Sequence, residues 1–270
     1  MLQKELTLRE SQHAALGVLE KVDQICRELG IKYYLMWGTL IGTIRHHGFI
    51  PWDDDLDIAM FKKDYDLLKN FFDTHKKGCE PLYIDCYDSN NKCFYNIPRI
   101  CDSRYLLVFD NINYTSGMFI DVYILEGLGN EEDLSYWEKR FNKYDFYQKM
   151  IYMSSQKNLL FGSSLSHKIG NIPLCLISKI IGKKYFMNTM SSYKRFDVNK
   201  STYVGMPRWE KSIIKKEWFS DTIEKDFEGK KFYIPIGYDD ILKNEYGDYM
   251  KLPPESERHP YHGYKAYKKL

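Results

Sequence analysis

The chain has 270 residues, with 39 lysines and arginines against 37 aspartates and glutamates, so its formal net charge is only +2. With 44% hydrophobic and 28% charged residues, it has a globular composition that excludes disorder, collagen-like repeats and a membrane-embedded protein. The near-neutral charge also argues against a general nucleic-acid binder, for which a strongly basic domain is expected. Aromatic residues are in excess at 16% of the chain, and this excess needs a reason.

The front half predicts alternating helices and strands. Thr7-Leu8-Arg9-Glu10 has the form of a capping box, so a helix is expected to begin there. Apolar residues then recur at three- and four-residue steps, at Leu16, Leu19, Val22, Cys26 and Leu29, until Gly30 ends the helix. The elements expected here are a helix over 7–29, strand 33–36, helix 40–47, strand 56–60 and helix 64–73.

The pattern changes twice after residue 80. Short β-rich runs are predicted at 82–87, 94–100, 105–109 and 118–125. Helical spacing follows over 131–153 and 174–196, and a β-like run at 230–234 precedes a helix near 238–246. The order predicts an α/β (α+β) fold with a core over residues 1–129 and a mainly helical lobe over 130–270.

The N-terminus and the cysteines bear on the compartment. Residues 1–6 contain no apolar stretch of the signal-peptide kind, and no window reaches the roughly 18 apolar residues of a spanning helix. We therefore expect a cytoplasmic chain whose six cysteines are free thiols. No two cysteines have the close spacing of zinc ligands, so zinc is not expected.

The segment Asp53-Asp54-Asp55-Leu56-Asp57 carries the strongest chemical signal. On a strand, Asp55 and Asp57 project from one face, where two carboxylates suit a hard cation such as Mg²⁺. Asp53 shares that face if the strand begins early, whereas Asp54 is expected to point away. The pair alone is weak evidence, because a chain this acidic contains about five acid-x-acid triplets by chance.

The surroundings of the acid pair strengthen the signal. Gly38-Thr39 is predicted at a strand-to-helix turn, where phosphate approaches the backbone, and Arg45 can supply phosphate donors from the following helix. Asp121 is the lone charge in the apolar run 117–124, and the alternative to a role in the site is that it is an ordinary polar residue at a strand end. This order of elements is the layout of the nucleotidyltransferase superfamily: a strand, a Gly-Thr turn, a helix and then an Asp-x-Asp strand, with a third carboxylate nearby.

Residues 37–58, WGTLIGTIRHHGFIPWDDDLDI, resemble the signature of the LicD family of phosphocholine transferases and of the related fukutin-related ribitol-phosphate transferases. The tail is also similar to the family's C-terminal motif, with Tyr246-Gly247-Asp248-Tyr249-Met250, then Pro253-Pro254 and Arg258-His259. The resemblance implies a nucleotidyltransferase-like mixed sheet flanked by helices. It covers nearly the whole chain and is least specific over 130–200.

The resemblance implies Mg²⁺-dependent transfer of phosphocholine from CDP-choline to a sugar hydroxyl of a cell-surface glycan, a teichoic acid or lipopolysaccharide precursor, with release of CMP. The metal-binding role falls on Asp55, Asp57 and Asp121, with Mn²⁺ as the alternative ion, and Asp53 matches an acidic position of the ribitol-phosphate enzymes. Asp121 and Asp53 remain alternative proton acceptors. The zinc-binding cysteine insert of those relatives is missing from this sequence.

Substrate-binding residues can be predicted around this centre. Gly38, Thr39 and Arg45 are expected to hold the donor phosphates, and Arg258 and His259 to contact phosphate or acceptor. Trimethylammonium groups are recognised by aromatic faces, although most aromatic residues belong to ordinary cores and surfaces. The candidates in or near the motifs are Trp52, Trp209, Tyr246 and Tyr249, and His262 is a weaker candidate for acceptor contact.

Residues 157–184 mix leucines and isoleucines with lysines, as a membrane-surface segment does. A lipid-linked acceptor at the inner membrane face would explain such a segment, and an amphipathic helix covering the core is the alternative. Three rival functions also remain: a transferase for another CDP-activated alcohol phosphate such as ribitol phosphate, a nucleotidyltransferase, and a non-enzymatic nucleotide-binding module.

Overall fold

The structure is a computed structural model that describes residues 2–87, 90, 92–162, 164–206, 213–260 and 263–269. Two residues predicted above to take part in binding, Trp209 and His262, lie outside the described residues.

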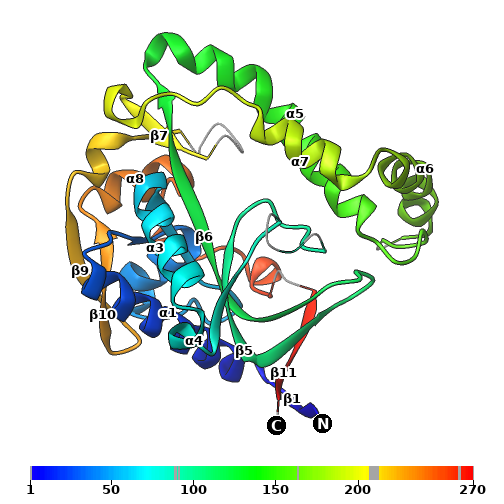
Figure 1. Cartoon of the computed structure of the whole chain (residues 1–270), viewed down its shortest axis with the longest axis horizontal. Helices are drawn as coiled ribbons and strands as arrows, with labels where there is room; N and C mark the ends of the chain where they lie inside the picture. The colour runs from blue at the N-terminus through cyan, green and yellow to red at the C-terminus, as the bar shows by residue number, and fades with distance from the viewer. Residues whose placement is uncertain are drawn as a thin grey trace.

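A nine-stranded mixed sheet forms the centre of the molecule, and its longest strand is β6 (Thr115–Gly129) (Figure 1). The main path of the sheet is β1 (Leu2–Glu5), β11 (Tyr264–Lys269), β5 (Arg99–Phe109), β6, β3 (Asp57–Phe61) and β2 (Tyr34–Leu35). β4 (Leu82–Asp85) pairs with β5, and β7 (Tyr203–Gly205) joins β6 to β8 (Ile213–Lys215). β3 and β6 run parallel, and the other described pairs are antiparallel.

Helices cover the sheet and extend beyond it. α1 (Leu8–Leu29) begins at the predicted capping box and ends at Gly30, whose φ of 66° is the left-handed conformation that glycine adopts at a helix end. The remaining helical elements are α2 (Trp37–Ile41), the π-helix η1 (Gly42–His46), α3 (Lys62–Thr74), α4 (Lys76–Cys79), η2 (Glu131–Asp133), α5 (Leu134–Ser154), α6 (Leu165–Ile181), α7 (Lys183–Ser191), η3 (Val198–Lys200), η5 (Lys216–Phe219), α8 (Tyr238–Tyr246) and η6 (Glu255–Glu257).

One large hydrophobic core joins α1, the central strands and the hairpin of β9 (Thr222–Phe227) and β10 (Lys230–Pro235). The predicted core positions Leu16, Leu19, Val22 and Cys26 of α1 are buried, whereas Leu29 is exposed. All six cysteines are free thiols, as expected, and five of them are buried.

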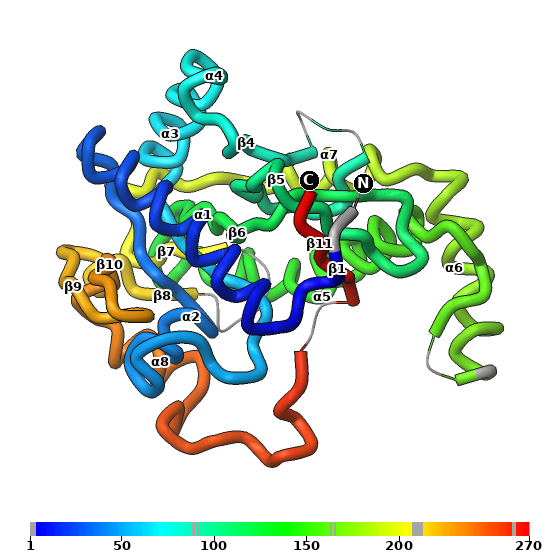
Figure 2. The backbone as a smooth tube through the Cα atoms, turned by 90° about the horizontal axis from the view of Figure 1, so that it is seen from below, coloured from blue at the N-terminus to red at the C-terminus, as the bar shows by residue number. Residues whose placement is uncertain are grey.

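The predicted α/β fold with a mixed sheet and flanking helices is confirmed. The runs 94–100 and 105–109 are not two strands, because β5 begins only at Arg99 and continues to Phe109. The back half contributes more strand than predicted, since β7, β8, β9 and β11 lie there besides β10. β11 returns to the central sheet and lies beside β1, so the two ends of the chain are neighbours (Figures 1 and 2). The division at residue 129 stays a prediction.

α5, α6 and α7 form a helical arm that extends away from the sheet (Figure 1). The arm has a small core of its own, built from Tyr144, Met150, Ile151, Phe186, Met187 and Met190. Within the described part of the chain, no helix combines the length and the hydropathy that crossing a bilayer requires.

Candidate active site

Three carboxylates meet where β3 and β6 run side by side. Asp57 is the first residue of β3 and lies directly opposite Asp121 of β6, and Asp55 comes from the segment just before β3. One carboxylate oxygen from each of the three lies within 4.8 Å of the others. We call these three residues the carboxylate cluster. Hard oxygen ligands in such a group suit Mg²⁺.

A buried arginine offsets part of the charge of the cluster. Arg99 of β5 donates from Nε to Asp121 Oδ1 at 2.6 Å, and its side chain is only 1% exposed. Its guanidinium carbon lies 3.2 Å from the ring centre of Tyr95 and 3.7 Å from that of Phe119. Although burial opposes its charge, Asp121 raises the pKa of Arg99 above its ordinary value. Arg99 is thus a buried cationic partner of Asp121 within the cluster.

A second acidic group overlaps the first. Carboxylate oxygens of Asp53, Asp54 and Asp55 also lie within 4.8 Å of one another. Asp54 is not part of the carboxylate cluster and is not among the described residues that line the first cavity, and residues 53–56 precede β3, where regular side-chain alternation begins. Asp54 is buried, and the hydroxyl of Tyr264 in β11 donates to its backbone oxygen at 2.7 Å.

A cavity of about 650 Å³ opens beside the carboxylate cluster, and we call it the first cavity. Its acidic lining includes Asp53, Asp55 and Asp57, and the described tail adds Asp248 and Glu257. Its aromatic lining is Trp37, Trp52, Tyr123, Tyr246 and Tyr249. The predicted residues Gly38, Arg45, Trp52, Tyr246 and Tyr249 are thus brought together at one cavity.

The carboxylate of Asp53 lies directly against Gly38. A Cβ on this residue would lie 2.6 Å from Asp53 Oδ2. Its neighbour Trp37 has a φ of 47°, a left-handed conformation that is uncommon for a bulky residue and is found mostly at functional sites. The turn therefore holds the backbone close to Asp53.

Thr39 does not line the first cavity among the described residues. It is buried, and its hydroxyl oxygen accepts a hydrogen bond from the backbone N–H of Asp57 at 2.8 Å. The geometry gives this side chain a positioning contact to the first residue of β3. The predicted contact with donor phosphate stays a prediction.

Arg45 links the turn to the C-terminal tail. Its Nη1 donates to the backbone oxygens of Tyr249 at 2.6 Å and Lys251 at 3.2 Å. Residues 248–260 form the wide loop beside α2 in Figure 2. Arg45 therefore both lines the first cavity and holds its outer wall.

The two other tail residues predicted to bind substrate lie at the rim. Arg258 lies over the ring of Trp52, with its guanidinium carbon 5.5 Å from the ring centre, and its Nε donates to Pro253 O at 3.0 Å. His259 is exposed. Neither is among the described residues that line the first cavity, so contact with substrate stays a prediction for both.

Tyr246, a tyrosine of the first cavity, stays protonated. Desolvation of Tyr246 Oη, reinforced by Glu245, Asp57, Asp53 and Asp55, raises its pKa well above 10, although 44% of the whole residue is exposed. A neutral phenol can donate a hydrogen bond to an anionic substrate group.

Trp37, Tyr123 and Arg99 were not predicted as site residues. Trp37 and Tyr123 form one wall of the first cavity, with ring centres 4.0 Å apart. The sequence did contain a signal for Arg99. It is a charged residue in the predicted strand 94–100, followed by the apolar residues Ile100 and Cys101, just as Asp121 is a charged residue in an apolar strand.

A mixed sheet that sets carboxylates from adjacent parallel strands beside a large polar and aromatic cavity defines a phosphotransferase of the nucleotidyltransferase-like class. Residues 30–151 match the family described as LicD/FKTN/FKRP, nucleotidyltransferase domain. The lipopolysaccharide cholinephosphotransferase LicD of Haemophilus influenzae is 32% identical over 276 residues, which cover 98% of this chain and 99% of the relative. The chain belongs to the LicD family and is an enzyme.

Shorter matches reach other relatives. The human ribitol 5-phosphate transferase FKRP is 39% identical over 57 residues, covering 21% of this chain and 10% of the relative. The uncharacterized protein RP689 of Rickettsia prowazekii is 24% identical over 166 residues, covering 56% of this chain and 62% of that protein.

Proposed function

We propose that the chain transfers phosphocholine from CDP-choline to a sugar hydroxyl of a lipopolysaccharide precursor and releases CMP. The observation that carries the proposal is the aromatic and acidic first cavity, which shares Asp55 and Asp57 with the carboxylate cluster. The name and the full-length similarity of the Haemophilus influenzae relative support the choice of donor alcohol and acceptor. A teichoic acid precursor is the alternative acceptor.

Asp55, Asp57 and Asp121 would hold Mg²⁺, or Mn²⁺ in its place. The ion would supply positive charge to the diphosphate and to the entering and leaving oxygens. The protein's own residues have other tasks. Gly38 lets the backbone lie close to Asp53, and Asp53 and Asp121 are the two candidate acceptors for the proton of the attacking hydroxyl.

The first cavity has the properties that a choline headgroup requires. Trimethylammonium offers no hydrogen-bond donor, so aromatic faces and diffuse negative charge must attract it. Trp37, Trp52, Tyr123, Tyr246 and Tyr249 supply the faces, and Asp248 and Glu257 lie in the same lining. A volume of about 650 Å³ is in the usual range for sites that enclose a small-molecule ligand.

The test is release of CMP from purified protein with Mg²⁺ and a deacylated lipopolysaccharide oligosaccharide, using CDP-choline and CDP-ribitol in parallel. We expect CMP from CDP-choline, loss of the reaction with EDTA and recovery with added Mg²⁺. Asp55→Asn should lower the rate by more than about a hundredfold, because a cation ligand is lost. CMP from the ribitol donor alone would overturn the choline assignment.

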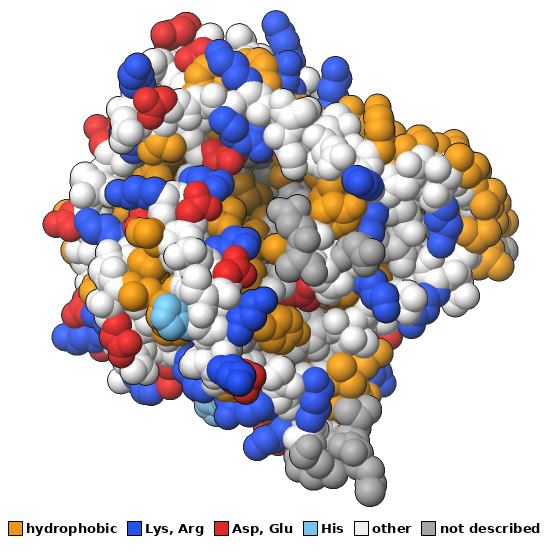
Figure 3. Space-filling view, in the orientation of Figure 1, with side chains coloured by type: hydrophobic (Ala, Val, Ile, Leu, Met, Phe, Trp, Pro, Cys, Tyr) orange, Lys and Arg blue, Asp and Glu red, His pale blue; other side chains and the backbone are white. Residues whose placement is uncertain are grey.

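We also propose that the arm contacts the membrane that carries the acceptor. Ile169, Pro173, Leu176, Ile177, Ile180 and Ile181 of α6 are exposed at helical spacing and form an outward apolar stripe. The buried positions Cys175 and Ser178 face the protein instead. In Figure 3, hydrophobic side chains gather at the end of the molecule where Figure 1 places α6.

The lysines of this segment divide into two groups. Lys179 Nζ donates to Gln156 O at 2.6 Å, next to the end of α5, and Lys183 Nζ donates to Cys93 O at 3.0 Å, which ties the arm to the segment before β5. Lys168 and Lys184 are exposed, and positive charge there would favour anionic headgroups around the inserted stripe. An apolar stripe that faces outward argues against the alternative of an amphipathic helix covering the core.

A further inference from the structure

A second cavity of about 210 Å³ lies against the carboxylate cluster, and it shares Asp55 and Tyr123 with the first cavity. Asp121 and Arg99 complete its inner wall. The cluster therefore separates two hollows, one beside the C-terminal tail and the other beneath the helical arm.

The outer wall of the second cavity comes from two elements. Tyr95 and Asn96 lie in the segment before β5, and Gln148, Ile151 and Tyr152 lie on one face of α5 at three- and four-residue spacing. A neighbouring cavity of about 170 Å³ shares Asn96 with it and continues along the base of the arm to Glu126 and Arg195. The two small cavities therefore lie next to each other along the arm.

Two buried donors in the second cavity lack a well-formed hydrogen bond among the described residues. They are Nη1 of Arg99 and Nε2 of Gln148. Arg99 is 1% exposed, and its other nitrogens are held by Asp121. A buried donor that lacks a protein acceptor is costly, and a ligand oxygen at these points would remove that cost.

The chemistry of this wall fits a saccharide. A sugar ring presents hydroxyl oxygens at its edge and C–H groups on its faces, and the wall offers amide and guanidinium donors beside the rings of Tyr95 and Tyr152. The described lining of the second cavity has two carboxylates and one arginine, whereas that of the first has five carboxylates against Arg45 and Lys251, so the second is the less acidic of the two.

We propose that the second cavity binds the acceptor saccharide, so that donor and acceptor approach the carboxylate cluster from opposite sides. This inference rests on the proposed function. The attacking hydroxyl oxygen forms a bond to the phosphorus of phosphocholine, and the bond from that phosphorus to the bridging oxygen breaks. CMP leaves with the electron pair, and the hydroxyl proton passes to one of the two candidate acceptors, Asp53 or Asp121.

Gln148→Leu tests the inference, because it removes the amide and keeps the approximate side-chain volume. Initial rates are measured with donor and acceptor varied in turn. We expect the KM for the oligosaccharide to rise about tenfold, as loss of a buried hydrogen bond does, with the KM for CDP-choline unchanged. Trp52→Ala, in the first cavity, should raise the KM for CDP-choline instead. Lys149→Ala, at the exposed neighbouring position on α5, is the matched control and should change neither.

Binding of the oligosaccharide in the absence of donor separates this inference from the proposed function. Calorimetry should show weaker binding to Gln148→Leu than to the wild type, whichever donor the enzyme uses. Unchanged oligosaccharide affinity in Gln148→Leu, or a raised KM for CDP-choline in that variant, would overturn the inference. Absence of CMP release by the wild type would overturn the proposed function and leave the binding result in force.

Discussion

Two acidic residues at the site, Asp53 and Asp57, are positioned by contacts with the turn at Gly38 and Thr39. The backbone N–H of Asp57 is bound by the Thr39 hydroxyl, and the Asp53 carboxylate lies over Gly38, which has no Cβ. The two contacts join residues 18 and 15 positions apart in the signature segment. The glycine and threonine therefore position the acids, and the acids supply the chemistry.

Gly38→Ala is the residue-scale prediction. The new methyl group would lie 2.6 Å from Asp53 Oδ2, so the carboxylate has to move out of its place at the first cavity. Because the obstacle is a side chain and not backbone, we expect a loss of unfolding free energy of only about 1 kcal/mol. The rate of CMP release should fall by at least about tenfold.

Thermal melts followed by circular dichroism, together with initial rates, measure both effects of Gly38→Ala. Gly78→Ala is the matched control, because a Cβ there has open space around it. An active Gly38→Ala enzyme with a normal KM for CDP-choline would contradict the positioning of Asp53.

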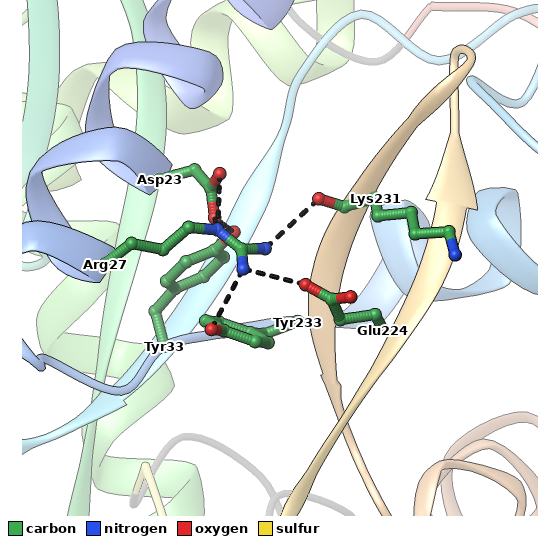
Figure 4. A network of polar contacts seen from close by, with 6 residues as sticks. All are labelled: Asp23, Arg27, Tyr33, Glu224, Lys231 and Tyr233. Carbon is green, nitrogen blue, oxygen red and sulfur yellow. Dashed lines mark hydrogen bonds and ion pairs between the residues drawn. The ribbon is translucent and has the colours of Figure 1, made fainter.

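At the scale of elements, the β9–β10 hairpin connects α1 to the segment that leads into the carboxylates. Arg27 of α1 donates from Nη1 to Glu224 at 2.7 Å and to the hydroxyl of Tyr233 at 3.0 Å, and its Nε bonds Asp23 (Figure 4). At the hairpin tip, Glu228 has a φ of 52° and Gly229 of 77°, as a two-residue hairpin turn of this kind requires.

The tip of the hairpin holds the turn before the acids. Glu228 Oε1 accepts from the backbone N–H of Phe49 at 3.1 Å and from Arg9 Nη1 at 3.0 Å, and the N–H of Glu228 donates to His47 O at 3.0 Å. The hydrogen bond from Arg9 lowers the pKa of Glu228 below its ordinary value of 4.5.

This lowered pKa predicts a pH effect on stability. Because the folded state favours the ionised form, the contribution of Glu228 is fully present above its ordinary pKa and is lost as pH falls through the lowered folded value. Glu228→Gln should therefore reduce the free energy of unfolding at pH 7 and have a much smaller effect in strong acid. Urea unfolding across pH 3–7 measures it, with exposed Glu217→Gln as control. An equal difference at every pH would contradict the ionic explanation.

Elements held by local rules could be predicted from the sequence, and elements held by distant partners could not. The capping box and Gly30 bound α1, and periodicity located α3 and α8, because these signals act within one turn of helix. β11 was missed, since its six residues become a strand only by pairing with β1 and β5. In the same way, Asp55, Asp57 and Asp121 could be grouped from the layout, but the contact of Arg99 with Asp121 depends on the register of β5 against β6.

At the scale of the whole molecule, the two cavities and the apolar stripe of α6 indicate how the enzyme would be oriented on a membrane. The second cavity lies against the last two turns of α5, the end of that helix that leads to α6, and the stripe lies on α6. An acceptor anchored in a bilayer that meets α6 would have its glycan beside α5. Sequence periodicity identified the basic and apolar character of 157–184, but only the packing of Cys175 and Ser178 reveals that the apolar stripe faces outward.

The last prediction tests whether the apolar stripe of α6 contacts a membrane. Ile177→Asp combined with Ile180→Asp places two charges in the stripe, where Ile180 is 83% exposed, so the fold should be unaffected while insertion becomes costly. The wild type should co-sediment with vesicles of phosphatidylglycerol and phosphatidylethanolamine, and the double variant should lose most of this binding. Leu67→Asp is the matched control, because Leu67 is an exposed leucine of α3 outside the arm.

Lys168→Glu with Lys184→Glu should weaken binding to the anionic vesicles, and more so at low salt, since charge attraction is screened as salt rises. CMP release with the soluble oligosaccharide should be unchanged in all these variants, because the stripe is remote from the reacting atoms. Undiminished co-sedimentation of the aspartate double variant would remove the membrane contact, and a dimer that it converts to monomer would identify the stripe as a contact between two copies of the chain.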